Sequence, residues 1–253
     1  MIRKLLHSTA IAVIGVMALG TGASASGTPD GSPTPQDFAA MREQVQDKAT
    51  VDRLAGTVFP HSPQVSPAVA AQNAHADAAT LIPVYVPDAA FVAGDSPTLG
   101  RLAYVAAPAT TGNGSVATVW MHRSGADWSV YNVASGDVEK RLAADAGNGY
   151  LLHEPQTGAW YSVDGDRVTV LEGATTGVAK GTAMAVQDYR TVLHDRYGDK
   201  LPGSDYARSG AAGGYGAEPA IPFPVQPVLI AAAIVIAIGG AFAVPRLRRM
   251  MRR

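Results

Sequence analysis

The stretch SVATVWMHR-SGA-DWSVYNVA, residues 115–134, decides the fold of this 253-residue chain. Two runs rich in β-branched and aromatic residues flank a break of small residues at 124–126. This pattern predicts a β-hairpin with a three-residue loop, in which Arg123 faces Asp127. Apolar side chains fall on both faces of the hairpin, so we expect its sheet to need cover on both sides, or a partner.

A second hairpin is predicted where residues 160–163 and 166–171 flank Asp164-Gly165, a dipeptide suited to a type I′ turn. A helical pattern follows each hairpin, the first at 138–146 and the second ending before Gly198. The repeated order predicts an α+β domain. Its small antiparallel sheet would be built from two hairpin-helix (ββα) units, with the helices on one face.

Two further strands are expected upstream, near 81–86 and at 102–106. Pro83 and Pro87 fall in the first of them. Proline has no backbone N–H to donate to a ladder, so we expect this strand at an edge of the sheet.

Composition divides the chain into eight segments. The boundaries follow from apolar periodicity, Pro and Gly content and charge. In chain order they are a signal peptide (1–25), a disordered leader (26–33), a helical segment (34–58), a Pro/Ala-rich linker (59–79), the α+β domain (80–201), a Gly/Ala/Pro stalk (202–227), a transmembrane helix (228–244) and a cytoplasmic tail (245–253).

The membrane anchor is predicted from residues 228–244, which carry no charge. Their helix would be roughly 26 Å long, close to the thickness of a hydrocarbon core. An arginine-rich tail follows, and the positive-inside rule places it in the cytoplasm. The arginines that fix this orientation are Arg246, Arg248, Arg249, Arg252 and Arg253.

The N-terminus has the pattern of an export signal. Arg3 and Lys4 precede an apolar stretch, and Ala23 and Ala25 form a small-x-small cleavage site. We expect cleavage after about residue 25, although an uncleaved anchor is the alternative. The two signals together predict a single-pass type I membrane protein of the cell envelope, with the domain outside the cell and the C-terminus in the cytoplasm.

The exported part is acidic. It holds 13 of the 20 Lys and Arg and all 21 Asp and Glu, which gives a formal charge of −8. Such a surface repels phosphate backbones, so nucleic acid is not an expected partner. We expect contacts with membrane lipid through the C-terminal helix, and with an envelope protein or a cell-wall component through the domain.

The chain contains no cysteine, which excludes a disulfide framework, thiol catalysis and zinc-thiolate sites. The sequence also carries no phosphate loop, nucleophile elbow or dinucleotide fingerprint. We therefore predict no cofactor and no enzymatic activity.

Aromatic residues of the two hairpins are the candidate binding residues. As an exposed platform they would suit a glycan or a peptide, whereas as core residues they would only pack. The candidates are Trp120, Trp128, Tyr131, Trp160 and Tyr161.

Three histidines, His122, His153 and His194, are candidate metal ligands or general bases, although their spacing matches no known metal motif. If the sheet brought them together with Glu154, the protein could be a membrane-tethered hydrolase or a metal-dependent enzyme. This is the alternative to the leading hypothesis, a non-catalytic binding or structural domain.

The whole layout resembles exported, C-terminally membrane-anchored proteins of high-GC Gram-positive bacteria. The resemblance rests on the signal at 1–25, the Ala/Gly/Pro-rich linkers, the cysteine-free domain and the arginine tail. Leu201 to Asp205 also resembles a sortase signal, but Ser204 and Asp205 stand where that motif has Thr and Gly. Processing at this segment is left open.

Overall fold

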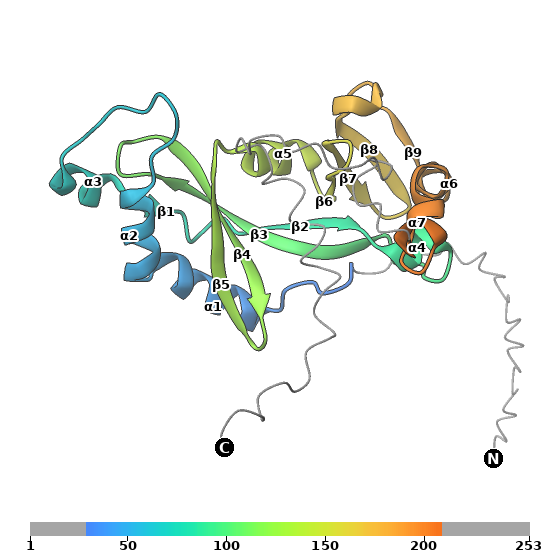
Figure 1. Ribbon diagram of the computed structural model, residues 1–253, viewed down its shortest axis with the longest axis horizontal. Coiled ribbons are helices and arrows are strands. Elements are labelled where there is room, and N and C mark those ends of the chain that lie inside the picture. Colours follow the sequence, from blue (N-terminus) through green and yellow to red (C-terminus); the bar gives the residue numbers. More distant parts are fainter. Residues whose placement is uncertain (1–28, 209–253) are drawn as a thin grey trace, which may run out of the picture.

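The computed structural model describes residues 29–208, which form one mixed sheet with helices on both faces (Figure 1). Eight strands pair in the order β5-β4-β3-β2-β6-β7-β8-β9, and β1 pairs with β3. The strands are β1 (His75–Ala76), β2 (Ile82–Pro87), β3 (Gly100–Thr110), β4 (Val116–Ser124), β5 (Asp127–Ser135), β6 (Tyr150–Glu154), β7 (Ala159–Asp164), β8 (Arg167–Glu172) and β9 (Ala183–Ala185).

Short helices connect and cover these strands. The helical elements are α1 (Pro35–Gln46), α2 (Lys48–Gly56), α3 (Pro67–Asn73), α4 (Ala89–Ala93), α5 (Val138–Ala146), α6 (Val186–Tyr197) and α7 (Asp205–Arg208), with 3₁₀ turns η1 (Ala174–Thr176) and η2 (Gly198–Lys200). The helix predicted at 138–146 is confirmed as α5, and the one predicted before Gly198 is confirmed as α6. Part of the expected linker, residues 67–76, forms α3 and β1.

The expected fold class is wrong in two respects. The sheet has nine strands, and it is mixed because β2 and β6 run parallel, which joins the two hairpins into one sheet. β2 is therefore an interior strand despite its prolines. Its pairing with β6 covers only Val84 and Tyr85, which lie between Pro83 and Pro87, so neither proline belongs to the parallel ladder.

The second error concerns the helices, which cover both faces of the sheet. Alternation along β3 shows this directly, because successive side chains point to opposite faces. Val105 packs with core residues of α1 and α2, whereas Tyr104 packs on the other side with Leu142 of α5. α4 and α6 cover the far half of the α1–α2 face, where Leu102 of β3 contacts both core clusters.

The predicted hairpins exist, but both registers are shifted. In the first hairpin Ser124 faces Asp127, so the turn has two central residues, and Gly125 takes a φ of +66° at the first of them. A bulge then inserts Tyr131 as an extra residue in β5, between Val130 and Asn132. In the second hairpin Asp164 faces Arg167, one position later than expected.

Residues 29–33, which were expected to be a leader, lie against β3. The pairing of β4 with β3 ends at Met121 and Val105, since β4 residues 122–124 pair only with β5. Residues 100–102 of β3 therefore lack a β4 partner, and Asp30 pairs with them instead. Its backbone N–H donates to Gly100 O and its carbonyl accepts from Leu102 N, both at 2.8 Å.

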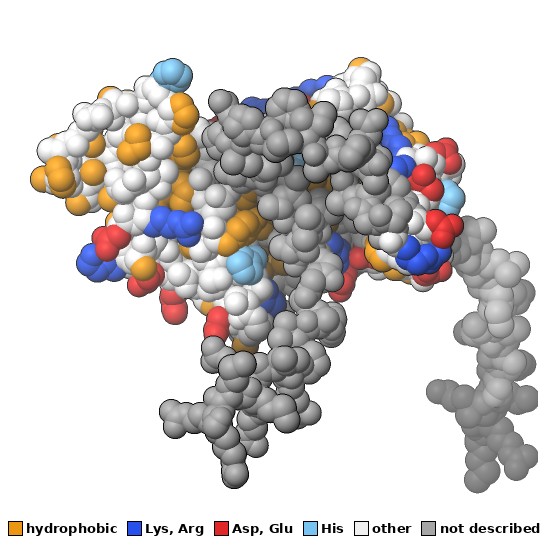
Figure 2. All heavy atoms as spheres, viewed as in Figure 1, with side chains coloured by type: hydrophobic (Ala, Val, Ile, Leu, Met, Phe, Trp, Pro, Cys, Tyr) orange, Lys and Arg blue, Asp and Glu red, His pale blue; other side chains and the backbone are white. Residues whose placement is uncertain are grey.

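Exposed hydrophobic side chains gather on the part of the surface formed by α2, α3 and the neighbouring strands (Figure 2). The most exposed is Val58, at 68%, between α2 and α3. Among the described residues, no helix has both the length and the apolar character needed to cross a membrane. The expected signal with Ala23 and Ala25, the anchor at 228–244 and the arginine tail lie outside the described residues.

α1 is fastened to the first hairpin by one carboxylate. Asp37 completes a capping box with Thr34, accepts a hydrogen bond from Trp128 Nε1 at 2.9 Å, and pairs with Arg123 at 2.7 Å. The guanidinium of Arg123 lies 4.9 Å above the Trp128 ring. The Trp128 hydrogen bond, with further hydrogen bonds from Thr34 and Arg123, holds the pKa of Asp37 far below its usual value.

The first prediction concerns this contact. Because the pKa of Asp37 is lower in the folded state, its contribution to stability is present above the unfolded-state pKa, about 3.9, and is lost as the pH falls below it. Asp37→Asn should lower the free energy of unfolding at pH 7 by about 1–2 kcal/mol and flatten its decline between pH 4 and pH 2. Urea unfolding at several pH values measures both effects.

The matched control is Asp52→Asn, which removes an exposed pair with Lys48 on α2. It should change the stability by less than about 0.5 kcal/mol. Equal effects of the two variants would contradict a special role for Asp37.

Candidate functional site

Two glutamates are buried in this domain, on opposite faces of the sheet. Glu154, at the end of β6, is completely buried and faces α6. Glu139, in the first turn of α5, is 4% exposed and faces β3. Burying a carboxylate is costly unless it is paired and hydrogen-bonded, so the surroundings of each one show what it can do.

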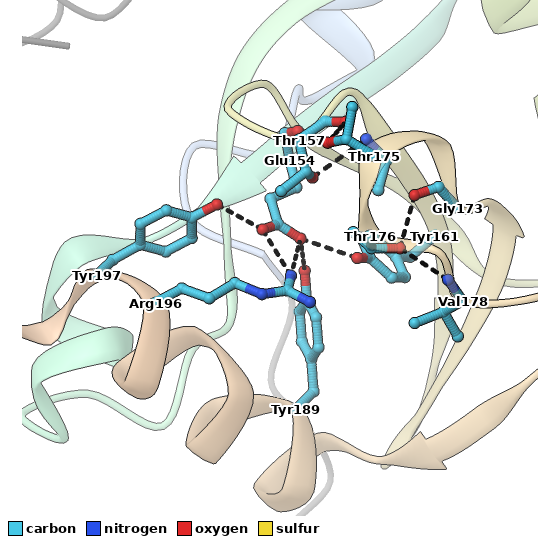
Figure 3. Close-up of polar contacts among 11 residues, drawn as sticks. Glu154, Thr157, Tyr161, Gly173, Thr175, Thr176, Val178, Tyr189, Arg196 and Tyr197 are labelled. Atoms are coloured by element: carbon cyan, nitrogen blue, oxygen red, sulfur yellow. Dashed lines mark hydrogen bonds and ion pairs between the residues drawn. The ribbon is translucent and has the colours of Figure 1, made fainter. Parts of the chain in front are cut away.

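Glu154 is surrounded by donors from the protein itself (Figure 3). Arg196 Nη1 lies 2.9 Å from Oε1 and 3.1 Å from Oε2. Three tyrosine hydroxyls also donate to this carboxylate: Tyr161 at 2.8 Å, Tyr189 at 3.2 Å and Tyr197 at 2.6 Å. Positions 189, 196 and 197 lie on one side of α6 because they are seven and eight residues apart.

The Glu154 cluster fixes α6 to the sheet. Burial, reinforced by the negative charge of Glu154, raises the pKa of Tyr161 to about 12, so this hydroxyl keeps its proton and remains a donor. The same causes raise the pKa of Tyr189 further. Since a cation and three hydroxyls already satisfy the carboxylate, the cluster is a structural anchor.

Glu139 has different neighbours. The Tyr104 hydroxyl donates to its Oε1 at 3.0 Å. In residues 29–208, no Lys, Arg or His forms an ion pair with this carboxylate. Burial raises the pKa of Tyr104 and of Tyr131, and the nearby negative charge of Glu139 raises both further.

Rings from three strands continue this cluster into what we term the aromatic row, consisting of Tyr104, Trp120, Tyr131 and His122. Tyr104 stacks on Trp120, with 4.6 Å between ring centroids and 28° between planes. Trp120 lies 6.1 Å from Tyr131, and Tyr131 lies 4.9 Å from His122. The side chains of Trp120, Tyr131 and His122 are half-buried, so the row is partly open to solvent.

The five predicted aromatic residues do not form a single platform. Trp120 and Tyr131 belong to the aromatic row. Trp128 is buried beneath α1, on the opposite face, and Tyr161 is buried beside Glu154. Trp160 is buried on the α5 face, where His153 stacks on it with 4.1 Å between centroids.

The three histidines lie in three different places. His122 contacts Tyr131, His153 stacks on Trp160, and His194 packs against Gly198 at the end of α6. Glu154 follows His153 in β6 and therefore points to the other face. Within the part of the chain that the structure describes, no three His, Asp or Glu side chains are grouped closely enough to hold a metal ion.

Sequence reasoning missed Tyr104 and Glu139. Glu139 occupies the first turn of a helix. An acidic residue at such a position is commonly exposed and interacts favourably with the helix dipole. Only the packing of α5 onto the sheet identifies it as a buried charge.

Comparison with known proteins gives no guidance on this site, because no protein family, curated protein or solved structure matches the chain.

The second prediction concerns the Glu154 cluster. Glu154→Gln keeps the shape but removes the charge that Arg196 and three hydroxyls bind. The free energy of unfolding should fall by about 3 kcal/mol, because Arg196 and the three hydroxyls are left without the buried charge that they bind. Glu172→Gln, which removes a half-exposed partner of Arg141, should cost less than about 1 kcal/mol. Denaturant titration compares the two, and similar losses would refute the anchoring role.

The third prediction concerns His153. Burial lowers its pKa to about 4, below the unfolded-state value of about 6.5. Above pH 6.5 this titration leaves the free energy of unfolding unchanged. The free energy declines as the pH falls toward 4, because only the unfolded chain takes up the proton. His153→Phe should remove about 2 kcal/mol of this decline between pH 7 and pH 4.5. An unchanged decline in urea titrations would show that His153 is not its source.

Proposed function

We propose that this chain is a single-pass, membrane-anchored extracytoplasmic protein whose domain is a non-catalytic binding module of the cell envelope. The signal pattern at 1–25, the uncharged stretch at 228–244 and the arginines after it support export and anchoring. These segments lie outside the described residues, so this part of the proposal rests on sequence.

The observation that carries the binding role is the aromatic row. Its rings contact one another from Tyr104 to His122, and the half-buried side chains of Trp120 and Tyr131 remain partly exposed. The bulge that positions Tyr131 is held from α2, since Arg53 donates to the carbonyls of Val130 and Tyr131, both at 3.1 Å. A rigid, partly exposed aromatic surface suits recognition because little freedom is lost on binding.

The alternative function is a tethered hydrolase or metal-dependent enzyme that uses some of His122, His153, His194 and Glu154. The residues that it uses would have to lie in contact. The sheet separates His153 from Glu154, and the hydrogen-bonding capacity of Glu154 is already used by Arg196 and tyrosines. These observations favour binding. The expected partner is an envelope protein or a wall component rather than nucleic acid, given the charge of −8 on the exported part.

The fourth prediction tests this proposal in intact cells. A photo-reactive phenylalanine analogue at Tyr131 of the full-length protein should give reproducible cross-links to an envelope component. The yield should fall at least fivefold when Trp120→Ala removes the adjoining ring. Cross-linked products are separated by electrophoresis and identified by mass spectrometry.

The same analogue at Lys48, a strongly exposed position in the first turn of α2, is the control. Products that form equally from both positions, or none from Tyr131, would refute a binding surface at the aromatic row. Folding of the Trp120→Ala variant is checked by its resistance to protease.

A further inference from the structure

The two buried glutamates differ in one respect that bears on ligand chemistry. Glu154 has the guanidinium of Arg196 at 2.9 Å, whereas Glu139 has only the hydroxyl of Tyr104 and no cation among the described residues. A single neutral hydrogen bond compensates a buried negative charge poorly. The Glu139 side of the sheet therefore offers a negative charge that the described part of the protein leaves without an ion-pair partner.

Aromatic rings lie on the same side of the sheet as this charge, beginning with Tyr104, which donates to it. Tyr104 and Trp120 are stacked, the Tyr131 ring is inclined by 49° to Trp120, and the side chains of Trp120 and Tyr131 are partly exposed. The face of an aromatic ring carries negative potential, and it attracts cations that are weakly hydrated. A carboxylate and ring faces together favour positive charge at one place.

We infer that Glu139, with Tyr104, Trp120 and Tyr131, binds the ammonium group of an organic cation. This inference rests on the proposed binding function and adds the class of ligand. Arg53 contributes as a positioning residue, because its two hydrogen bonds hold the bulge that carries Tyr131.

The chemistry of the site distinguishes an ammonium group from other ligands. Mg²⁺ and Ca²⁺ need several oxygen ligands, whereas this site supplies one carboxylate and aromatic faces. A neutral sugar would use the ring faces but gain little from the carboxylate charge. An alkylammonium ion uses both, and the acidic exported part attracts it at long range.

The test is a titration of the full-length protein in detergent micelles with choline and with its neutral isostere, 3,3-dimethylbutan-1-ol, at equal ionic strength. The indole N–H signal of Trp120 in NMR spectra, assigned with a Trp120→Phe variant, is the readout. Choline should shift this signal saturably, with an affinity at least tenfold higher than that of the isostere, since only choline is charged. The indole signal of Trp128, on the other face, should not move.

Glu139→Gln should lower the affinity for choline to that of the isostere. Glu43→Gln, an exposed glutamate of α1, changes the net charge equally and should have no effect. Tyr131→Leu provides a second, half-buried position and should weaken choline binding about threefold or more. An unchanged Trp128 signal shows that each variant is folded.

The outcomes separate this inference from the proposed function. Equal binding of choline and the isostere, no binding of either, or no effect of Glu139→Gln would overturn the ammonium assignment. If cross-links from Tyr131 persist in that case, the aromatic row still binds a partner without using the charge. If the cross-links are also missing, both proposals fail.

Discussion

The parallel pairing of β2 with β6 is the contact on which the rest of the structure depends. Only Val84 and Tyr85 of β2 take part, opposite Leu151 and Leu152. Both pairs are buried, the pair Val84–Leu151 on the α5 face and the pair Tyr85–Leu152 on the α6 face. This short ladder joins two antiparallel halves into one sheet and thereby gives α5 and α6 a surface to cover on opposite sides.

The same pairing places the two buried glutamates. Glu154 ends the strand that pairs with β2, and Tyr104, the partner of Glu139, lies opposite Val84 in β3. The surroundings of the two charges differ. Helix α6 supplies a cation to Glu154, whereas α5 places Glu139 beside Tyr104, which stacks on Trp120. The first charge thus has an ion-pair partner, whereas the second has only a hydroxyl partner among the described residues.

Local patterns in the sequence were sufficient for the elements but not for their assembly. The helix at 138–146 and the two hairpins could be predicted, because apolar spacing and turn residues are local signals. Turn length could not be predicted, since a run such as Ser124 to Asp127 suits two-residue and three-residue loops, and each choice gives another register. Pairing of β2 with β6 joins residues 67 positions apart, as from Val84 to Leu151, and carries no local signal.

The candidate site was only partly predictable for the same reason. Trp120 and Tyr131 could be identified by type and by their place in a hairpin, whereas Trp128 and Tyr161 of the same pattern are core residues. Which face each aromatic residue occupies depends on the register and on the bulge at Tyr131. Glu139 gave no signal, and Glu154 was considered only as a possible partner of the histidines, because a carboxylate in a sequence is usually exposed.

The backbone of Asp30 completes an edge of β3 that the first hairpin leaves open. A shortened chain that began after Ser32 would present the N–H of Leu102 and the carbonyl of Gly100 as unpaired groups at the edge of β3. Such groups are a template for strands from other molecules. The few residues before α1 therefore cover this part of the β3 edge, and two copies that exchanged them would form a swapped dimer.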